Sequence, residues 1–203
     1  MNNNNHIRLL RYLLDEGLPA GCTISLGTGL HYGQEQLCTL LHLAARSGSH
    51  ALVELLIQRG ANISARVEIG KAWTPLHCAV VEQHPVVTRI LIQNGADVSD
   101  ADHQGTTLLH YSAIYGDPDV TGLLVENGAN ISAMDQTLRT PLHYAAMFGH
   151  EKTALILIEK GANLRARDEG GMTALRYAVD NGYHEMARLL RDNEAHVCRW
   201  RSC

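Results

Sequence analysis

Residues 140–149 read Thr-Pro-Leu-His-Tyr-Ala-Ala-Met-Phe-Gly. Thr140 is a favourable N-cap and Pro141 a favourable first helical residue, because the hydroxyl accepts a backbone N–H and proline presets φ. Gly149 stands where a short helix has to end, since glycine tolerates the positive φ of a tight turn. The stretch therefore predicts a short helix that begins at Pro141 and is reversed at Gly149.

The same stretch recurs along the chain at a nearly fixed spacing. Related starts lie at Thr74, Thr107 and Thr173, and together with Thr140 they are evenly spaced at about 33 residues. A further start, at Thr39, precedes Thr74 by a slightly longer interval. A second motif recurs at the same spacing. It is an apolar triplet followed by Gly-Ala-Asn or Gly-Ala-Asp, and its glycines are Gly60, Gly95, Gly128 and Gly161. Two landmarks in phase indicate stacked helix-turn-helix repeats.

These motifs resemble the ankyrin repeat family, whose repeats carry a Thr-Pro-Leu-His-x-Ala signature at this same period. The resemblance covers about residues 37–197. It implies an all-α solenoid of stacked helix-turn-helix units with β-turn fingers, in which the motif leucine, such as Leu142, belongs to the core between units. It also implies that the motif histidine bonds back to its threonine and to neighbouring loops. The histidines with this expected structural role are His42, His77, His110 and His143.

The repeat spacing predicts one array over residues 1–203. Its parts are an N-terminal capping helix at 1–19, an inserted loop or long first finger at 20–38, a repeat at 39–66, a repeat with a two-residue finger insertion at 67–102, repeats at 103–135 and 136–168, and a C-terminal capping repeat with its tail at 169–203. Gln83 replaces the turn glycine of the second repeat, and Glu194 replaces the last Gly-Ala-Asn glycine. Because other residues are strained in the left-handed region, we expect Glu194 to weaken the C-terminal repeat.

Composition and charge exclude several functions. The 17 Lys and Arg against 21 Asp and Glu give a net charge of −4 without a basic run, so we expect no nucleic-acid partner. The N-terminal residues carry neither a basic run nor a long apolar stretch, and no later segment approaches the ~20 apolar residues of a bilayer span. We therefore expect no signal segment, no membrane association and an intracellular, cytoplasmic or nuclear location. The five cysteines lack metal-ligand spacing. We therefore expect neither a metal nor a cofactor.

In ankyrin repeats the fingers and the concave face of the first helices contact partners. Three positions share that face, namely the residue after the motif histidine and the two residues before the turn glycine. In the middle repeats these positions are apolar, and exposed aromatic and methionine side chains with polar neighbours are typical of a binding hot spot. Alternatively, these side chains pack between adjacent first helices. The expected partner-binding residues are Trp73, Val81, Glu82, Tyr111, Ile114, Tyr115, Arg139, Tyr144, Met147, Phe148, Asp180 and Asn181.

Three hypotheses follow for the function. The leading one is a non-catalytic, monomeric protein-protein interaction scaffold that binds a hydrophobic or amphipathic segment of a partner on its concave face. An alternative is binding of a hydrophobic small molecule, or acid/base catalysis upon it, of a proton-transfer or cyclisation type. Its polar groups would be Tyr111, Tyr115, Tyr144, His103 and Asp180. The third hypothesis is a homodimer that buries the same patch. No nucleophile motif or carboxylate pair indicates catalysis, so no catalytic residue is assigned.

Overall fold

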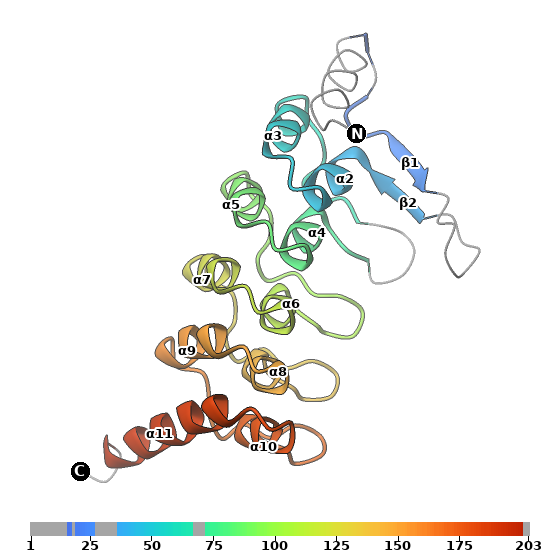
Figure 1. The fold of residues 1–203 in the computed structure, drawn as a ribbon. Helices are drawn as coiled ribbons and strands as arrows, with labels where there is room; N and C mark the ends of the chain where they lie inside the picture. Colours follow the sequence, from blue (N-terminus) through green and yellow to red (C-terminus); the bar gives the residue numbers. More distant parts are fainter. Residues whose placement is uncertain (1–15, 18, 27–35, 67–71, 201–203) are drawn as a thin grey trace. The chain divides into compact units, whose positions relative to one another are not determined.

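The computed structural model describes residues 16–17, 19–26, 36–66 and 72–200 of the chain. These residues contain ten α-helices and two short β-strands, which confirms the all-α repeat fold predicted from the sequence (Figure 1). Most of the predicted capping helix, the centre of the inserted loop and the start of the finger insertion in the second repeat lie outside the described residues. The chain forms two compact units, Met1–Asp97 and Val98–Cys203. The single uninterrupted array stays a prediction.

The first unit contains two strands and four helices among its described residues. They are β1 (Thr23–Leu26), β2 (Gln36–Thr39), α2 (Leu40–Arg46), α3 (His50–Gln58), α4 (Pro75–Val81) and α5 (Pro85–Gln93). The first helices α2 and α4 pack against each other, and so do the second helices α3 and α5. The unit is therefore two helical layers with the strand pair at its beginning.

The strand pair is a feature that the sequence analysis did not predict, because it assigned 20–38 to a loop. Strands β1 and β2 pair antiparallel, with Thr23 opposite Thr39 and Leu26 opposite Gln36. Strand β1, Thr-Ile-Ser-Leu, alternates polar with apolar residues, and both strands include a β-branched threonine, which favours extended backbone. The long finger is therefore tied together by backbone pairing where it joins α2.

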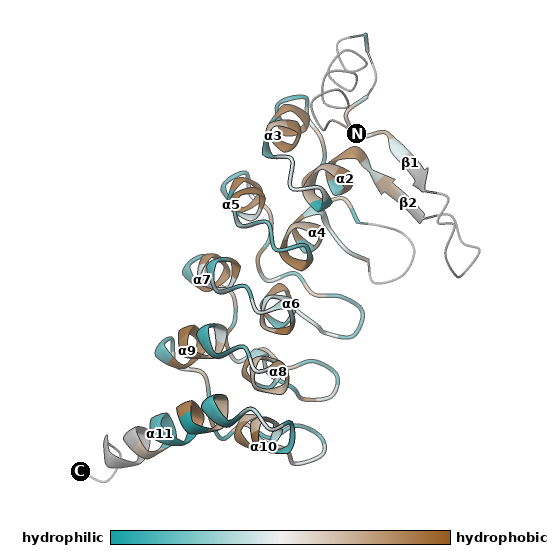
Figure 2. Cartoon of the chain, in the orientation of Figure 1, coloured by the Kyte–Doolittle hydropathy of each residue, from teal (hydrophilic) through white to brown (hydrophobic). Residues whose placement is uncertain are grey.

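The second unit contains six helices among its described residues. They are α6 (Leu108–Tyr115), α7 (Pro118–Glu126), α8 (Pro141–Phe148), α9 (Glu151–Glu159), α10 (Ala174–Asp180) and α11 (His184–Trp200). Helix α8 packs between α6 and α10, whereas α9 packs between α7 and α11. Figure 2 shows that apolar residues lie along these helices and that the connections between them are mainly hydrophilic. The first helices of successive repeats thus form one layer and the second helices another.

The first helices begin at the threonines that the sequence predicted. At the start of α6, the Thr107 N–H donates to His110 Nδ1 at 3.0 Å, and the Thr107 hydroxyl lies 2.8 Å from the same nitrogen. Because Nδ1 accepts, Nε2 carries the proton, and it donates to the Arg139 carbonyl at 2.9 Å. His42 and His143 join their own threonine to the next finger in the same way. The structural role expected of these three histidines is confirmed.

The helix reversals use the left-handed backbone where the sequence predicted it. Gly116 and Gly149 have φ of 74° and 70°, and Gln83 adopts 58° in place of a glycine. The expectation for Glu194 is wrong, because α11 runs through this position to Trp200 without reversing. Glu194 therefore needs no left-handed conformation, and its carboxylate instead accepts a hydrogen bond from Arg165 Nε at 3.1 Å.

Two leucines from each of four repeats lie in the cores of the two units, with two of these repeats in each unit. One comes from the Thr-Pro-Leu-His motif and one from the apolar triplet, and each is at most 1% exposed. They are Leu41, Leu56, Leu76, Leu91, Leu109, Leu124, Leu142 and Leu157. The corresponding motif leucine of the last repeat, Leu175, is only half-buried, since no described repeat packs over it. The core position expected of Leu142 is therefore confirmed.

Candidate functional site

The predicted partner-binding residues are divided between the two units. Trp73, Val81 and Glu82 belong to the first unit. The Trp73 ring is half-buried and stacks on the His77 ring at a centroid distance of 6.4 Å, so it packs against the first helix of its own repeat. Val81 is half-buried, whereas Glu82 is exposed and its Oε1 lies 3.9 Å from Arg46 Nε. Of these three side chains, Glu82 is the one most available to a partner.

Tyr111 is not a surface residue, contrary to the prediction. Its side chain is 2% exposed, and its hydroxyl donates to Asp102 Oδ2 at 2.7 Å. The position after the motif histidine faces the preceding finger, where the Asp102 carboxylate also accepts the backbone N–H groups of Gln104 and Thr106. The Tyr111 hydroxyl therefore holds α6 to the finger that directly precedes it, and the side chain is not available to a partner.

Tyr144 and Arg139 take part in the same kind of contact one repeat later. The hydroxyls of Tyr144 and Tyr177 donate to Asp135 and Asp168, both at 2.6 Å. The guanidinium carbon of Arg139 lies 6.0 Å and 5.7 Å from the centroids of these two rings. Arg139 Nε also lies 3.4 Å from Asp168 Oδ2. Cation–π contacts and the ion pair thus join two successive repeats, so this arginine is committed to the fold.

The electrostatics of these pairs do not favour proton transfer at neutral pH. Burial raises the pKa of Tyr144 to about 12, and the hydrogen bond to the Asp135 carboxylate adds to the shift. Burial disfavours the charged form of Asp135 too, but hydrogen bonds from Tyr144 and Thr137 outweigh it and hold the carboxyl pKa below its usual value. A general acid or base works best with a pKa near the operating pH. Tyr144 and Asp135 therefore have the character of a structural pair.

The residues before the turn glycines lie at the surface as predicted, though unequally. Tyr115 and Phe148 end α6 and α8, and they are 38% and 43% exposed. Ile114 and Met147, which precede them, are half-buried. The apolar positions that the sequence grouped together are thus adjacent in the second unit, with the aromatic rings as their outermost part.

Asp180 and Asn181 occupy the corresponding positions of the last repeat, and both are exposed. Asp180 accepts a hydrogen bond from Arg176 Nε at 2.9 Å, one turn earlier on α10. Asn181 Nδ2 donates to the Met147 carbonyl at 3.1 Å, which caps the end of α8. The predicted polar rim is present, and part of it also fastens α10 to α8.

His150 belongs to the same surface but was not predicted from the sequence. It directly follows a turn glycine, and its ring lies against Gly116 of the preceding repeat, where a side chain would collide with it. His150 Nε2 donates to the Ile114 carbonyl at 3.0 Å, and the ring stacks on Phe148 at 6.2 Å. His150 thus joins the turn after α6 to the turn after α8.

Tyr183 repeats this arrangement in the next repeat. Its ring lies against Gly149, with Cδ1 2.7 Å from the place a Cβ would take, and it is 38% exposed. We name this group of rings at the turns of successive repeats the aromatic edge. It consists of Tyr115, His150, Phe148 and Tyr183. The signal for the two missed residues was their position directly after Gly149 and Gly182.

The described residues offer little support for other chemistry. Within those ranges, no three His, Cys, Asp or Glu side chains are arranged to hold a metal ion. Burial raises the pKa of the Cys78 thiol to about 12, and it also raises that of Cys38, so neither is an activated nucleophile. No helix of the described part of the chain is long and apolar enough to cross a bilayer.

Comparison with known proteins identifies the repeat type. A family model of ankyrin repeats, three copies long, matches residues 41–135 and 133–199. Protein phosphatase 1 regulatory subunit 27 of Mus musculus is 45% identical over 65 residues, which are 32% of this chain and 41% of that protein. An ADP-ribosylation factor GTPase-activating protein of Arabidopsis thaliana is 39% identical over 74 residues, 36% of this chain and 9% of that protein.

A viral relative matches over a longer segment. A putative ankyrin repeat protein of Fowlpox virus (strain NVSL) is 32% identical over 105 residues, 52% of this chain and 28% of that protein. The chain therefore spans less than half the length of each of these three relatives.

Proposed function

Because this chain belongs to the ankyrin repeat family, we propose that it is a non-catalytic protein-protein interaction scaffold. Its partner contributes a hydrophobic or amphipathic segment that binds the face formed by the first helices of the second unit. The observation that carries this proposal is the exposure of Tyr115 and Phe148, 38% and 43%, at the ends of the adjacent helices α6 and α8. Large aromatic side chains on a rigid surface are the residues that most often dominate binding energy.

The surroundings of the aromatic residues support a binding surface that is already ordered before the partner arrives. His150 stacks on Phe148, and Asn181 caps the helix on which Phe148 lies. Arg139 joins the fingers of two repeats through Tyr177 and Asp168. Less conformational entropy is then lost on binding, which favours affinity.

The relatives support a protein as the class of partner. One of them is, by its name, a regulatory subunit of a protein phosphatase, and such a subunit acts on another polypeptide. Two of the three phenols proposed for proton transfer, those of Tyr111 and Tyr144, already donate to carboxylates, so they lend no weight to the small-molecule alternative.

The proposal is tested by photo-crosslinking from the surface itself. A photoreactive phenylalanine analogue replaces Phe148 in one variant and Leu155 in a control, because Leu155 is 40% exposed but lies on α9 in the other helical layer. In cells of the source organism we expect a crosslinked polypeptide from position 148 that is absent from position 155. A second substitution, Tyr115→Asn, should weaken that crosslink.

Two outcomes would contradict the proposal. Equal crosslinking from positions 148 and 155 would show that the first-helix face has no special role. Absence of any crosslinked polypeptide, together with a small bound mass in native mass spectrometry that Phe148→Asn removes, would favour the small-molecule alternative.

A further inference from the structure

The residues of the aromatic edge lie at the same end of three successive first helices, and one pair of rings, Phe148 and His150, is in stacking contact. The His150 ring lies against Gly116, next to Tyr115, and it stacks on Phe148. Tyr183 in turn lies against the glycine that follows Phe148. Tyr115, Phe148 and Tyr183 are each more than a third exposed. Three successive repeats of the second unit therefore each present an aromatic ring to solvent at the same end of their helices.

The charges beside the aromatic edge are almost all negative. Residues 114–119, 147–152 and 180–185, which hold the edge and the first turns of α7, α9 and α11, include five carboxylates and one lysine, Lys152. Two of the carboxylates already have partners, since Asp117 accepts backbone N–H groups of α7 and Asp180 pairs with Arg176. The segments that hold the edge thus carry more negative than positive charge.

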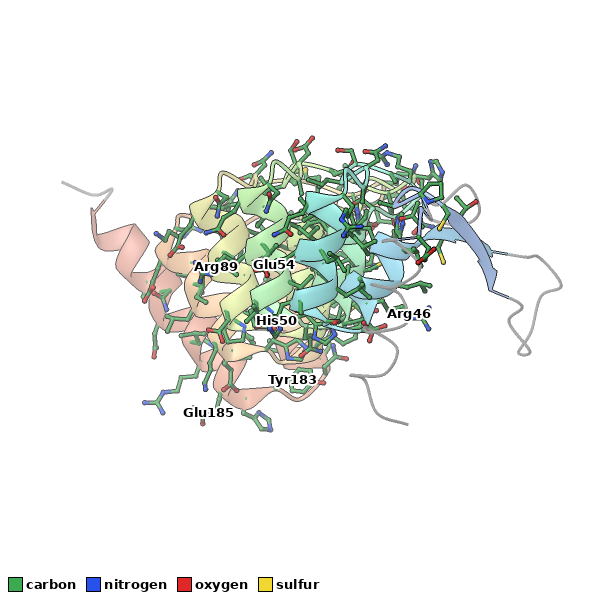
Figure 3. All side chains as sticks on the ribbon, turned by 90° about the horizontal axis from the view of Figure 1, so that it is seen from above. Arg46, His50, Glu54, Arg89, Tyr183 and Glu185 are labelled. Carbon is green, nitrogen blue, oxygen red and sulfur yellow. The ribbon has the colours of Figure 1, made fainter. Side chains whose placement is uncertain are left out.

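Three further carboxylates beside the edge are exposed, one in the first turn of each second helix. They are Asp119, Glu151 and Glu185. Among the described residues, none of the three forms an ion pair with a side chain. In Figure 3 the side chains of Tyr183 and Glu185 both project from the ribbon at the beginning of α11. Tyr183 and Glu185, two positions apart in the sequence, therefore bring an aromatic ring and a carboxylate to the same end of α11.

Within the second unit, aromatic rings and a carboxylate already bind a cationic side chain. The Arg139 guanidinium lies over the rings of Tyr144 and Tyr177 and pairs with Asp168. A cation is attracted by the faces of aromatic rings and by a nearby carboxylate at the same time. The aromatic edge offers these two kinds of group at the surface.

We propose that the segment bound by this chain is cationic as well as apolar, an amphipathic peptide whose Lys or Arg side chains alternate with aromatic or aliphatic ones. Its apolar side chains pack on Phe148 and Tyr115, while its cationic groups lie against the rings and pair with Asp119, Glu151 and Glu185. The inference rests on the proposed function and adds the charge of the partner to it. Charge complementarity selects this partner over neutral or acidic segments of equal hydrophobicity.

A random library of displayed 16-residue peptides is the probe that tests this inference. The purified full chain is immobilised, and the selected peptides are sequenced before and after selection. We expect enrichment of peptides that combine Lys or Arg with aromatic or aliphatic residues. We also expect their affinity to fall as the salt concentration rises, because exposed charge pairs are screened.

Variants of the chain then separate charge from hydrophobicity. The triple variant Asp119→Asn, Glu151→Gln, Glu185→Gln should bind the selected peptides about 10-fold more weakly, as expected for the loss of several exposed charge pairs. A matched control neutralises three exposed carboxylates away from the edge, Glu126→Gln, Glu159→Gln and Glu169→Gln. The control has the same net charge, and it should change affinity by no more than about 2-fold.

The outcomes distinguish failure of the inference from failure of the proposed function. If the enriched peptides are neutral or acidic, or if both triple variants lose affinity equally, the inference is wrong. Loss of binding in Phe148→Asn would in that case still support a hydrophobic partner segment. If no peptide is enriched over the starting library, or if Phe148→Asn binds the selected peptides as tightly as the unmodified chain, the proposed function and the inference are both wrong.

Discussion

The repeats that begin at Thr140 and Thr173 belong to the same unit and follow the same course, but they present different residues to solvent. The first ends its leading helix with an exposed Phe148. At the corresponding place in the next repeat, Asn181 instead donates a hydrogen bond to the Met147 carbonyl. The comparison shows that the repeat framework leaves the residue before the turn glycine free to vary. The residue at that single position decides whether the end of the helix offers a binding surface or forms a capping contact.

The same two repeats also differ in how much their framework is constrained. His143 links its threonine to the next finger, whereas Arg176 stands at the corresponding position and pairs with Asp180 on its own helix. Helix α9 ends at Glu159, whereas α11 continues to Trp200. A repeat covered on both sides must satisfy contacts in both directions, so its sequence is the more restricted of the two.

The largest expected effect comes from truncating the motif leucine of the covered repeat. Leu142→Ala should lower the free energy of unfolding by about 2–5 kcal/mol, because Leu142 is 1% exposed and its removal leaves a cavity. Leu175→Ala, at the half-buried corresponding position, should cost less than half as much. Urea unfolding followed by circular dichroism measures both. Equal losses would mean that the two repeats are equally covered.

A smaller effect is expected from acid. Burial lowers the pKa of His143, and of His42 and His110, so between the folded and unfolded pKa values the unfolded chain binds more protons. The free energy of unfolding should therefore fall as the pH drops below about 6.5, the ordinary histidine value.

Urea midpoints measured on both sides of that pH test the acid effect. His143→Gln should lower stability overall but make the pH dependence shallower than in the unmodified chain. An unchanged pH dependence in the variant would show that His143 does not contribute to it.

An increase in stability is expected at a strained finger. Leu138 has φ of 60°, whereas Gly105 and Gly171 hold φ of 74° at the corresponding positions of the neighbouring repeats. Leu138→Gly should raise the free energy of unfolding by about 0.5–1 kcal/mol, because relief of left-handed strain exceeds the added entropy of the unfolded chain. Thermal unfolding measures the change, and Gly171→Ala should move stability the other way. A loss on Leu138→Gly would show that packing of the leucine outweighs its strain.

The smallest effect on folding should come from the residue that matters most for binding. Phe148→Asn gives the covered repeat the residue that the last repeat has at this position. Because Phe148 is 43% exposed, the free energy of unfolding should change by no more than about 0.5 kcal/mol. Peptide affinity should nevertheless fall by at least about 10-fold, as for a hot-spot aromatic residue. A large loss of stability would instead place the ring among the structural contacts.

Much of the fold could be predicted because it is encoded locally and repeated. Thr107 and Thr140 start helices by bonding within their own first turn, and Gly116 and Gly149 reverse the chain through their own φ. The motif leucine recurs in every repeat, so its burial follows from the period. The strand pair β1 and β2 was not predicted because it lies in the insertion at 20–38, which has no counterpart in the other repeats, so the repeat period carries no information about it.

The site was predicted less completely, because it depends on contacts between repeats. Tyr115 and Phe148 were identified correctly as surface residues, from their place before the turn glycines. Tyr111 was expected at the surface, but its hydroxyl reaches Asp102 on the preceding finger. Tyr183 was not considered, because its packing on Gly149 joins residues of two repeats.

The sequence by itself determined the repeat period, the helix starts, the turn glycines and the leucine core, since each follows from bonds or burial patterns that recur from one repeat to the next. Only the tertiary structure decided which of the residues that differ from the repeat pattern are exposed to solvent. His150 reaches the Ile114 carbonyl in the preceding repeat, and Arg139 meets Tyr177 in the next one. Stacking brings such residues together, and a side chain that finds a partner there is withdrawn from solvent. Phe148 keeps more than a third of its surface exposed, and so it remains available for binding.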